Sequence, residues 1–193
     1  MRVVLASQSP QRRALLEGLG VEFEVAEPRV TELTEGDPRE MVLENARWKA
    51  ASIAPMEPPG TLVIAGDTEV ALDGAALGQP VDPDEAREHL ERLSGREHEV
   101  LGAVALMGPE SGEDGLARAR QGVLASTVRF HELSQALLEA YLASGEWEGR
   151  AGSYAIQGLG SALVAEVRGD VSNVIGLPVG LLLELAPELV PRS

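Results

Sequence analysis

Two periodicities of apolar and polar residues alternate along the 193-residue chain, and together they predict both strands and helices. Short apolar runs, some alternating with polar residues, are typical of strands that are buried on one or both faces. Such runs occupy residues 3–6, 21–25, 62–65, 69–72, 99–107, 121–130 and 163–167. We expect the two long runs to pair antiparallel through a polar, glycine-bearing connection over 108–115. We also expect Gly66-Asp67-Thr68 to interrupt the strand between 62–65 and 69–72, and Asp73-Gly74 to form a hairpin turn.

Helix start signals fall between these runs. Ser9-Pro10 combines an N-cap residue with proline at the first helical position, and Asp37-Pro38 and Asp82-Pro83 add the glutamate of a capping box. The five predicted helices end near Gly20, Ala54, Gly95, Ser144 and Leu185, and residues 55–60 are predicted to form a loop. Alternation of strands and helices is typical of an α/β or α+β protein with a mixed sheet. Since no repeat or linker divides the chain, we expect one domain over residues 1–193.

The charge of the chain limits what it binds. Sixteen basic residues against thirty-one acidic ones give a net charge of −15, a field that repels nucleic acid and anionic lipid. We therefore expect neither a nucleic acid polymer nor a membrane as a partner. No apolar run is long enough to span a membrane and no cysteine is present, so a cytoplasmic protein is expected. A small anionic ligand is compatible with this charge if cations gather locally and a metal ion assists.

Several common sites are missing from the sequence. It contains no P-loop, no dinucleotide-binding glycine fingerprint and no nucleophile elbow of a serine hydrolase. Its three histidines lie far apart along the chain, which argues against a zinc site.

The segment from Ser7 to Arg13 is the first candidate for chemistry. It follows the first predicted strand and opens a helix, so free backbone amides, two hydroxyl groups, Gln11 and the guanidinium groups of Arg12 and Arg13 come together. Such a helix start is a natural phosphate site. The alternative is an ordinary capped helix whose arginines are solvated.

Three further residues are candidates for a charged site. Asp67 follows a strongly apolar run, and a carboxylate there needs a metal ion, a water molecule or a lysine as its partner. Lys49 is the only lysine among the sixteen basic residues, which favours a specific need for a compact ammonium. Glu32 is a loop acid. In the alternative interpretation, Asp67 caps a turn and Lys49 is a solvated helix residue.

Glycines are dense between Gly149 and Gly160, and the segment carries one amide side chain, Gln157. This composition fits close approach of the backbone to a planar ligand. A tight connector between two elements is the alternative.

In this order along the chain, the segments resemble the Maf family of nucleoside triphosphate pyrophosphatases. The matching segments are Leu5-Ala6-Ser7-x-Ser9-Pro10-x-Arg12, Ala46-Arg47-x-Lys49-Ala50, Gly66-Asp67-Thr68, Leu93-Ser94-Gly95-Arg96-x-His98-x-Val100, Ala151-Gly152-x-Tyr154-x-Ile156-Gln157-Gly158 and Asn173-Val174-Ile175-Gly176-Leu177-Pro178. The resemblance extends from residue 3 to about residue 185. It implies an α/β fold with a mixed twisted sheet, flanking helices and two lobes around a deep cleft, and a homodimer.

The resemblance also implies an activity, the cleavage of a nucleoside triphosphate between its α and β phosphates with the help of Mg²⁺ or Mn²⁺. It makes Asp67 and Lys49 the catalytic residues, with Asp67 as the general base, and it makes Glu32 and Asp67 metal ligands. Ser7, Arg12 and Lys49 are then contacts of the triphosphate.

Four positions bear on the substrate within this resemblance. Thr68 and Gln157 match the branch that acts on dTTP and UTP, whereas the branch that acts on 7-methylguanosine triphosphate has Gln and Glu there. Gln11 and Gln79 stand where the family usually has arginine and lysine, and Arg13 lies one place beyond the usual arginine pair. The sequence therefore predicts a dTTP/UTP pyrophosphatase. The alternatives are a 7-methylguanosine triphosphate pyrophosphatase and a nucleotide-binding regulator of cell division with little turnover.

Overall fold

Seven strands form one mixed sheet in the computed structural model of this protein, which describes residues 1–108 and 120–190. The strands are β1 Arg2–Ala6, β2 Glu24–Ala26, β3 Thr61–Leu72, β4 Ala75–Ala76, β5 Glu97–Met107, β6 Arg120–Phe130 and β7 Val164–Arg168. Their order is β2-β1-β3-β5-β6-β7, and β4 pairs with β3. β1 runs parallel to β2 and β3, and the other pairs are antiparallel. The predicted mixed sheet is confirmed, whereas most of the predicted connection 108–115 lies outside the described residues.

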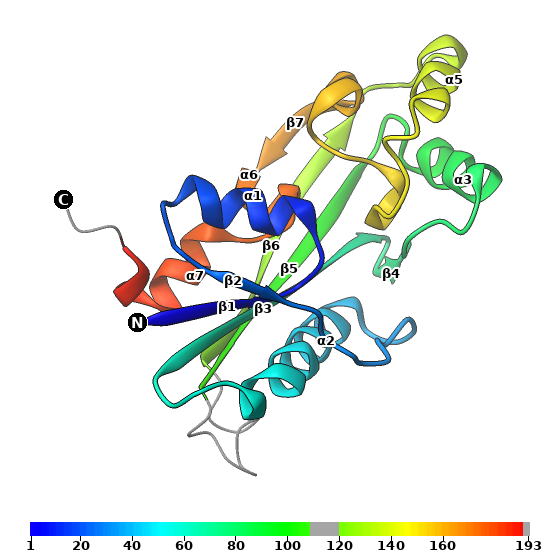
Figure 1. Ribbon diagram of the computed structural model, residues 1–193. Coiled ribbons are helices and arrows are strands. Elements are labelled where there is room, and N and C mark those ends of the chain that lie inside the picture. The colour runs from blue at the N-terminus through cyan, green and yellow to red at the C-terminus, as the bar shows by residue number, and fades with distance from the viewer. Residues whose placement is uncertain (109–119, 191–193) are drawn as a thin grey trace.

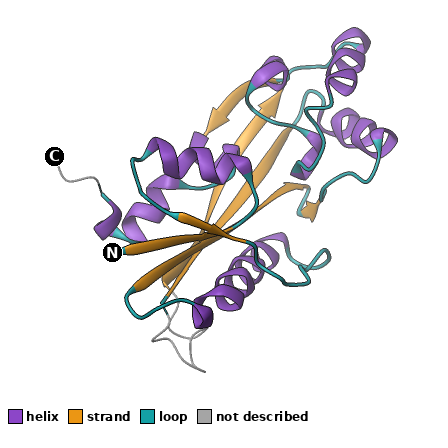
Figure 2. Ribbon diagram, viewed as in Figure 1, coloured by secondary structure: helices purple, strands orange, loops and turns teal. Residues whose placement is uncertain are grey.

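Helices cover both faces of this sheet. They are α1 Pro10–Gly18, α2 Pro38–Ile53, α3 Pro83–Leu93, α5 Gln135–Ser144, α6 Val171–Ile175 and α7 Val179–Leu185, with short 3-10 turns η1 Ala54–Met56, η3 Ala151–Ser153, η4 Gly158–Ala162 and η5 Pro187–Leu189. Figure 1 and Figure 2 show α1 and α2 on opposite sides of β1 and β3, while α3 and α5 lie at the far end of β5 and β6. The two groups form the two expected lobes. None of the described helices has the length and apolar character that crossing a membrane requires.

The predicted helix starts are confirmed, because each depends on local hydrogen bonds. The side chain of Ser9 accepts from the amide of Arg12, and the aspartates at 37 and 82 each accept two amide hydrogen bonds of the first turn. Asp73 and Gly74 both have positive φ values, 54° and 80°, and turn β3 into β4 as a hairpin.

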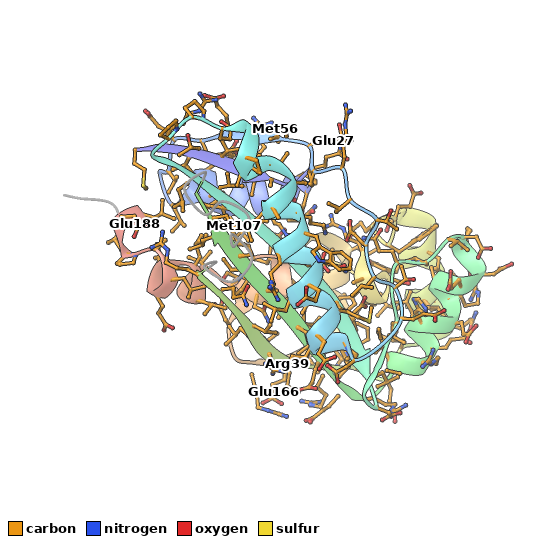
Figure 3. The ribbon with its side chains drawn as sticks, turned by 90° about the horizontal axis from the view of Figure 1, so that it is seen from below. Glu27, Arg39, Met56, Met107, Glu166 and Glu188 are labelled. Atoms are coloured by element: carbon orange, nitrogen blue, oxygen red, sulfur yellow. The ribbon has the colours of Figure 1, made fainter. Side chains whose placement is uncertain are left out.

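The pleat of the strands divides the core into two layers. Val4 and Ala6 of β1 pack with α2, whereas Val3 and Leu5 face the opposite way and pack with α1 and α7. Successive residues of β3 therefore face opposite sides of the sheet as well. A third apolar cluster joins α3 and α5 to the far ends of β5 and β6. Figure 3 shows α2 lying along the sheet, from Arg39 near its start to Met56 beyond its end.

The predicted interruption at Gly66-Asp67-Thr68 is wrong. β3 is continuous because β5 pairs with it from Val63 to Ala71 without a gap. A side chain at Gly66 would meet the carbonyl oxygen of Ala103 in β5, at 2.9 Å from the added Cβ, so glycine there permits the pairing. Asp67 is accordingly part of the central strand and not a residue that follows it.

Other differences are smaller. The strand expected at 21–25 is only Glu24–Ala26, and α6 and the four 3-10 turns were not predicted. These elements span three to five residues, which is too short for a hydrophobic period to develop.

The opposite edge of β3 is open in its middle. β1 pairs with residues 61–64 of β3 and β4 pairs with residues 71–72, so among the described residues no strand covers 65–70 on that side. The chain leaves β1 at Ala6 while β3 continues. A fork in the sheet results, and side chains from both faces of β3 can reach it.

A buried histidine makes the stability of this fold depend on pH. His98 Nε2 lies 2.8 Å from the hydroxyl oxygen of Tyr154, and the ring packs edge-on against Phe130 and Tyr154. Burial lowers the pKa of His98 to about 4. Between the unfolded value near 6.5 and about 4, the unfolded chain binds the proton that the folded chain excludes, so stability is lost as the pH falls through this range.

We expect this histidine to contribute a loss of about 3 kcal/mol in the free energy of unfolding between pH 7 and pH 4. Urea denaturation across that pH range should show that the free energy of unfolding falls more steeply for the wild type than for His98→Gln, whose side chain does not titrate. Equal slopes for the two proteins would contradict the prediction.

Candidate active site

Two adjoining cavities lie at the fork between β1 and β3. Six residues line both of them, namely Ser9, Gln11, Arg12, Thr68, Gln79 and Gly149. The first cavity, of about 380 Å³, is also lined by Ser7, Glu32, Lys49 and Asp67. The second, of about 120 Å³, reaches the far lobe and is also lined by apolar side chains, Arg150 and Gln157. The apolar residues of its wall include Val70, Val100, Tyr154, Ile156, Val174 and Ile175.

Lys49 joins two carboxylates in the first cavity. Its Nζ donates to Glu32 Oε2 at 2.6 Å and to Asp67 Oδ1 at 2.8 Å. The pleat of β3 turns Asp67 toward α2, which carries Lys49. The side chains of Lys49 and Asp67 are 8% and 13% exposed, whereas Glu32 is 46% exposed. The structure thus gathers three of the predicted site residues into one partly solvated charged cluster.

Asn45 holds this cluster in place, and the sequence analysis missed it. Its Nδ2 donates to Asp67 Oδ2 at 3.0 Å and to the Leu33 carbonyl oxygen at 3.1 Å, and its Oδ1 accepts from the Leu33 amide at 2.8 Å. It therefore fastens the segment that carries Glu32 to α2. That segment follows Glu27 down one side of α2 before entering the helix near Arg39 (Figure 3). Its spacing from Lys49 could have identified Asn45 in the sequence, since residues four apart share one helix face.

Arg12 approaches β3 from the other face of the sheet. Its Nη1 donates to Ser7 Oγ at 3.2 Å, its Nη2 to Thr68 Oγ1 at 3.1 Å and its Nε to the Gly176 carbonyl oxygen at 2.9 Å. Burial lowers the pKa of Arg12, and the charges of Asp67 and Glu32 oppose that shift. All three hydrogen-bond partners are neutral, so this buried guanidinium has no bound counter-charge. An anion in the cavity would supply one.

Four glutamines line the cavities, namely Gln8, Gln11, Gln79 and Gln157. The Ser9 hydroxyl donates to Gln11 Oε1 at 3.1 Å, while Gln79 and Gln157 are exposed on the walls. Glu69 supports the turn before Gln79, since its Oε1 accepts from the amides of Val70 and Gly78 at 2.8 and 2.9 Å. Burial raises the pKa of Glu69, and the two amide hydrogen bonds oppose the shift.

The turn after Gln157 is fixed by a carboxylate from the preceding segment. Glu146 accepts from the amides of Leu159 and Gly160, both at 3.0 Å.

Arg13 is not brought together with the other candidates. It lies on the exposed side of α1, where its Nε donates to Glu17 at 2.8 Å, and it lines neither cavity. The helix period explains this, because adjacent residues of a helix point about 100° apart and Arg12 takes the buried position.

The charged cluster fits a metal ion only in part. Among the described residues no three His, Cys, Asp or Glu side chains gather as ligands, and Glu32 and Asp67 are the carboxylates that line the cavity. Mg²⁺ is commonly held by one or two carboxylates together with substrate phosphates and water. This donor set therefore fits a Mg²⁺ or Mn²⁺ ion whose remaining ligands come from a bound phosphate chain.

Comparisons with known proteins show the family of this chain. Residues 2–189 match a family model described as Maf-like protein. A dTTP/UTP pyrophosphatase of Anaeromyxobacter dehalogenans is 47% identical over 92% of this chain and 89% of its own length. Proteins with the same name from Clostridioides difficile and Deinococcus radiodurans are 39% and 40% identical, over 96% and 95% of this chain and 93% and 91% of their own lengths. With nearly its whole length matched in sequence, the chain belongs to the Maf family.

Proposed function

We propose that this chain is a nucleoside triphosphate pyrophosphatase that hydrolyses dTTP and UTP to the monophosphate and pyrophosphate. The observation that carries the proposal is the fork of the sheet, where the Lys49–Asp67–Glu32 cluster faces the same cavity as Arg12. Anion-binding groups and a carboxylate with access to water thus meet beside a second cavity with apolar walls. The names of the relatives in the Maf family support the same substrates.

In this proposal Arg12, Ser7 and Lys49 bind the triphosphate. Arg12 has N–H groups beyond the three that are used within the protein, and Lys49 uses two of its three donors. Charge-assisted hydrogen bonds of this kind orient the phosphate chain and lower the cost of its charge. At the start of α1, Pro10 has no amide hydrogen and the Arg12 amide donates to Ser9 Oγ, so the Gln11 amide is the one proposed to donate to a phosphate.

Asp67 is proposed as the general base. Lys49 and Asn45 each donate to one of its oxygens, which fixes the plane of the carboxylate and leaves further lone pairs free. A water molecule at one of these lone pairs loses its proton to Asp67 as it attacks phosphorus, and the anhydride bond between the α and β phosphates breaks. The leaving pyrophosphate takes the bonding electron pair. Lys49 and Arg12 stabilise the charge that develops on the phosphate oxygens.

Glu32 and Asp67 are proposed to hold the divalent cation. A bound Mg²⁺ or Mn²⁺ would neutralise phosphate charge and polarise the phosphorus–oxygen bonds. In a protein with a net charge of −15, this neutralisation matters more than in a basic one.

The activity is tested by measuring pyrophosphate release from UTP, dTTP and 7-methylguanosine triphosphate, with Mg²⁺ or Mn²⁺ and with a chelator. We expect turnover of UTP and dTTP that the chelator abolishes and either metal restores. A clear preference for 7-methylguanosine triphosphate would refute the pyrimidine assignment. Nucleotide binding without product would instead favour a regulatory protein of cell division, consistent with the neutral Gln11 and Gln79 on the cavity walls.

Gln157 is proposed to read the base. Its amide has a donor and an acceptor, which match the neighbouring N–H and carbonyl groups of uracil and thymine. We expect Gln157→Glu to lower kcat/KM for UTP and dTTP by about tenfold to a hundredfold, the effect of one polar group left unpaired once the bound base covers it. Turnover of 7-methylguanosine triphosphate should stay constant or rise. Kinetics on all three nucleotides test this, and an equal loss on each would show that Gln157 only supports its loop.

We expect a homodimer, one domain over residues 1–193 and a cytoplasmic location, where nucleoside triphosphates are found. Sedimentation equilibrium and cell fractionation test the first and the last of these expectations.

A further inference from the structure

One cation on the cavity walls has no partner within the described part of the chain. Among the described residues the two cavities are lined by three cations, Arg12, Lys49 and Arg150, and by two carboxylates, Glu32 and Asp67. Lys49 is paired with both carboxylates, and their charges also act on Arg12. Within the part of the chain that the structure describes, the side chain of Arg150 has neither a hydrogen bond nor an ion pair.

The backbone that carries Arg150 is nevertheless fixed. The Arg150 amide donates to the Trp147 carbonyl oxygen at 3.2 Å, and the Arg150 carbonyl oxygen accepts from the Ser153 amide at 3.0 Å. The indole Nε1 of Trp147 donates to the Leu142 carbonyl oxygen of α5 at 3.0 Å. A half-buried cation without a partner thus stands on a firmly held turn at the wall of a cavity. Such a group is preorganised for a ligand, because little ordering of the chain is needed when it binds.

The same turn lies beside the loop of Gln79. The Gly152 amide donates to the Gly78 carbonyl oxygen at 2.8 Å, and Gln79 lines the same cavity as Arg150. Gln11, which also lines that cavity, is neutral too. Gly149, the residue before Arg150, lines both cavities, so Arg150 stands near the place where they join. In the proposed function, this junction is where the nucleoside meets the phosphate chain.

We infer that Arg150 binds a phosphate oxygen of the nucleoside triphosphate and supplies the positive charge that Gln11 and Gln79 do not. This inference rests on the proposed function for the identity of the ligand. A guanidinium suits the role because it keeps its charge and presents parallel N–H groups to a phosphate. A carbonyl oxygen of the base could accept from it as well, and the experiment is designed to separate the two contacts.

The test compares Arg150→Gln and Arg150→Lys with Arg129→Gln, a control that removes the same charge. Arg129 is 43% exposed on β6, is paired with Glu166 and lines neither cavity. Calorimetric titrations would use inorganic pyrophosphate, uridine and α,β-methylene-UTP, each with Mg²⁺. We expect Arg150→Gln to weaken binding of pyrophosphate and the UTP analogue by about tenfold to a hundredfold, as the loss of a charge-assisted hydrogen bond does. Uridine binding should stay unchanged, Arg150→Lys should restore part of the affinity, and Arg129→Gln should bind like the wild type.

Two further measurements make the test decisive. The midpoint of thermal unfolding should not change in Arg150→Gln, because the side chain has no partner to lose. In the pyrophosphate release assay, KM for UTP should rise by the same factor while kcat changes little.

Unchanged binding of the UTP analogue would overturn the inference, and so would weaker uridine binding with unchanged pyrophosphate binding. A wild-type protein that binds the analogue but releases no pyrophosphate would refute the proposed activity alone, since the role of Arg150 is measured by binding.

Discussion

Replacement of Asp67 by asparagine should lower pyrophosphate release by about a hundredfold to ten-thousandfold, the range typical of a lost general base. The variant keeps the shape of the side chain but cannot take a proton from water. Stopped assays with UTP at saturating concentration measure the loss in kcat directly.

Asp67→Asn should also destabilise the fold slightly. Both carboxylate oxygens accept hydrogen bonds, from Lys49 and from Asn45, and an asparagine can accept only one of them. Asn45 cannot turn its amide without losing its hydrogen bonds to Leu33, so two donors would face each other. The cost of one such unsatisfied group is about 1–3 kcal/mol.

Asp73→Asn is the matched control. Asp73 follows the same strand, is 72% exposed and pairs with Arg96 at 2.7 Å, away from both cavities. The Asp73→Asn variant should release pyrophosphate at the wild-type rate. If Asp67→Asn kept most of its activity, the base would lie elsewhere, with Glu32 as the next candidate.

Replacement of Lys49 by methionine should affect both stability and activity. Without the ammonium, the carboxylates of Glu32 and Asp67 face each other with no charge between them. Removal of one partner from a buried ion pair typically costs about 3–5 kcal/mol. Because Glu32 is 46% exposed, we expect the free energy of unfolding to fall by an amount near the lower end of this range, about 3 kcal/mol. Turnover should fall by roughly a hundredfold, since a charged donor to the phosphates is lost as well.

A double-mutant cycle separates this effect from a loss of packing. In the double variant Lys49→Met/Asp67→Asn, one of the two uncompensated charges is gone. The double variant should therefore lose less free energy of unfolding than the two single variants lose together. Urea denaturation of the four proteins measures the coupling. Additive losses would show that Lys49 contributes by packing alone.

The sequence predicted those parts of the fold that depend on neighbouring residues. Ser9, Asp37 and Asp82 each bind amides two or three residues ahead, so the helix starts are where the caps placed them. The Asp73-Gly74 turn was predicted for the same reason, because its two positive φ values suit these residues. The continuous strand β3 could not be predicted in this way. Its partners belong to β5, and they lie from 28 residues (Ala71 with Glu99) to 44 residues (Val63 with Met107) further along the chain.

For the candidate site, too, the sequence indicated the residue types but not which side chains face the cavities. The residue types of Ser7, Arg12, Lys49 and Asp67 indicated phosphate chemistry, and the order of their segments along the chain resembled the Maf family. The roles given to them stay predictions until the variants are measured. Arg13 had the same residue type and a neighbouring position, and only the direction of its side chain on α1 excludes it from the cavities.

Local chemistry therefore determined where helices begin, where tight turns fall and which residues are suited to bind phosphate, because these properties need only a few consecutive residues. The tertiary structure decided which of those residues meet. The contact of Lys49 with Asp67 and that of Arg12 with the Gly176 carbonyl span 18 and 164 residues of chain. Such contacts form only once strand register and helix packing are fixed by burial of apolar side chains throughout the sheet.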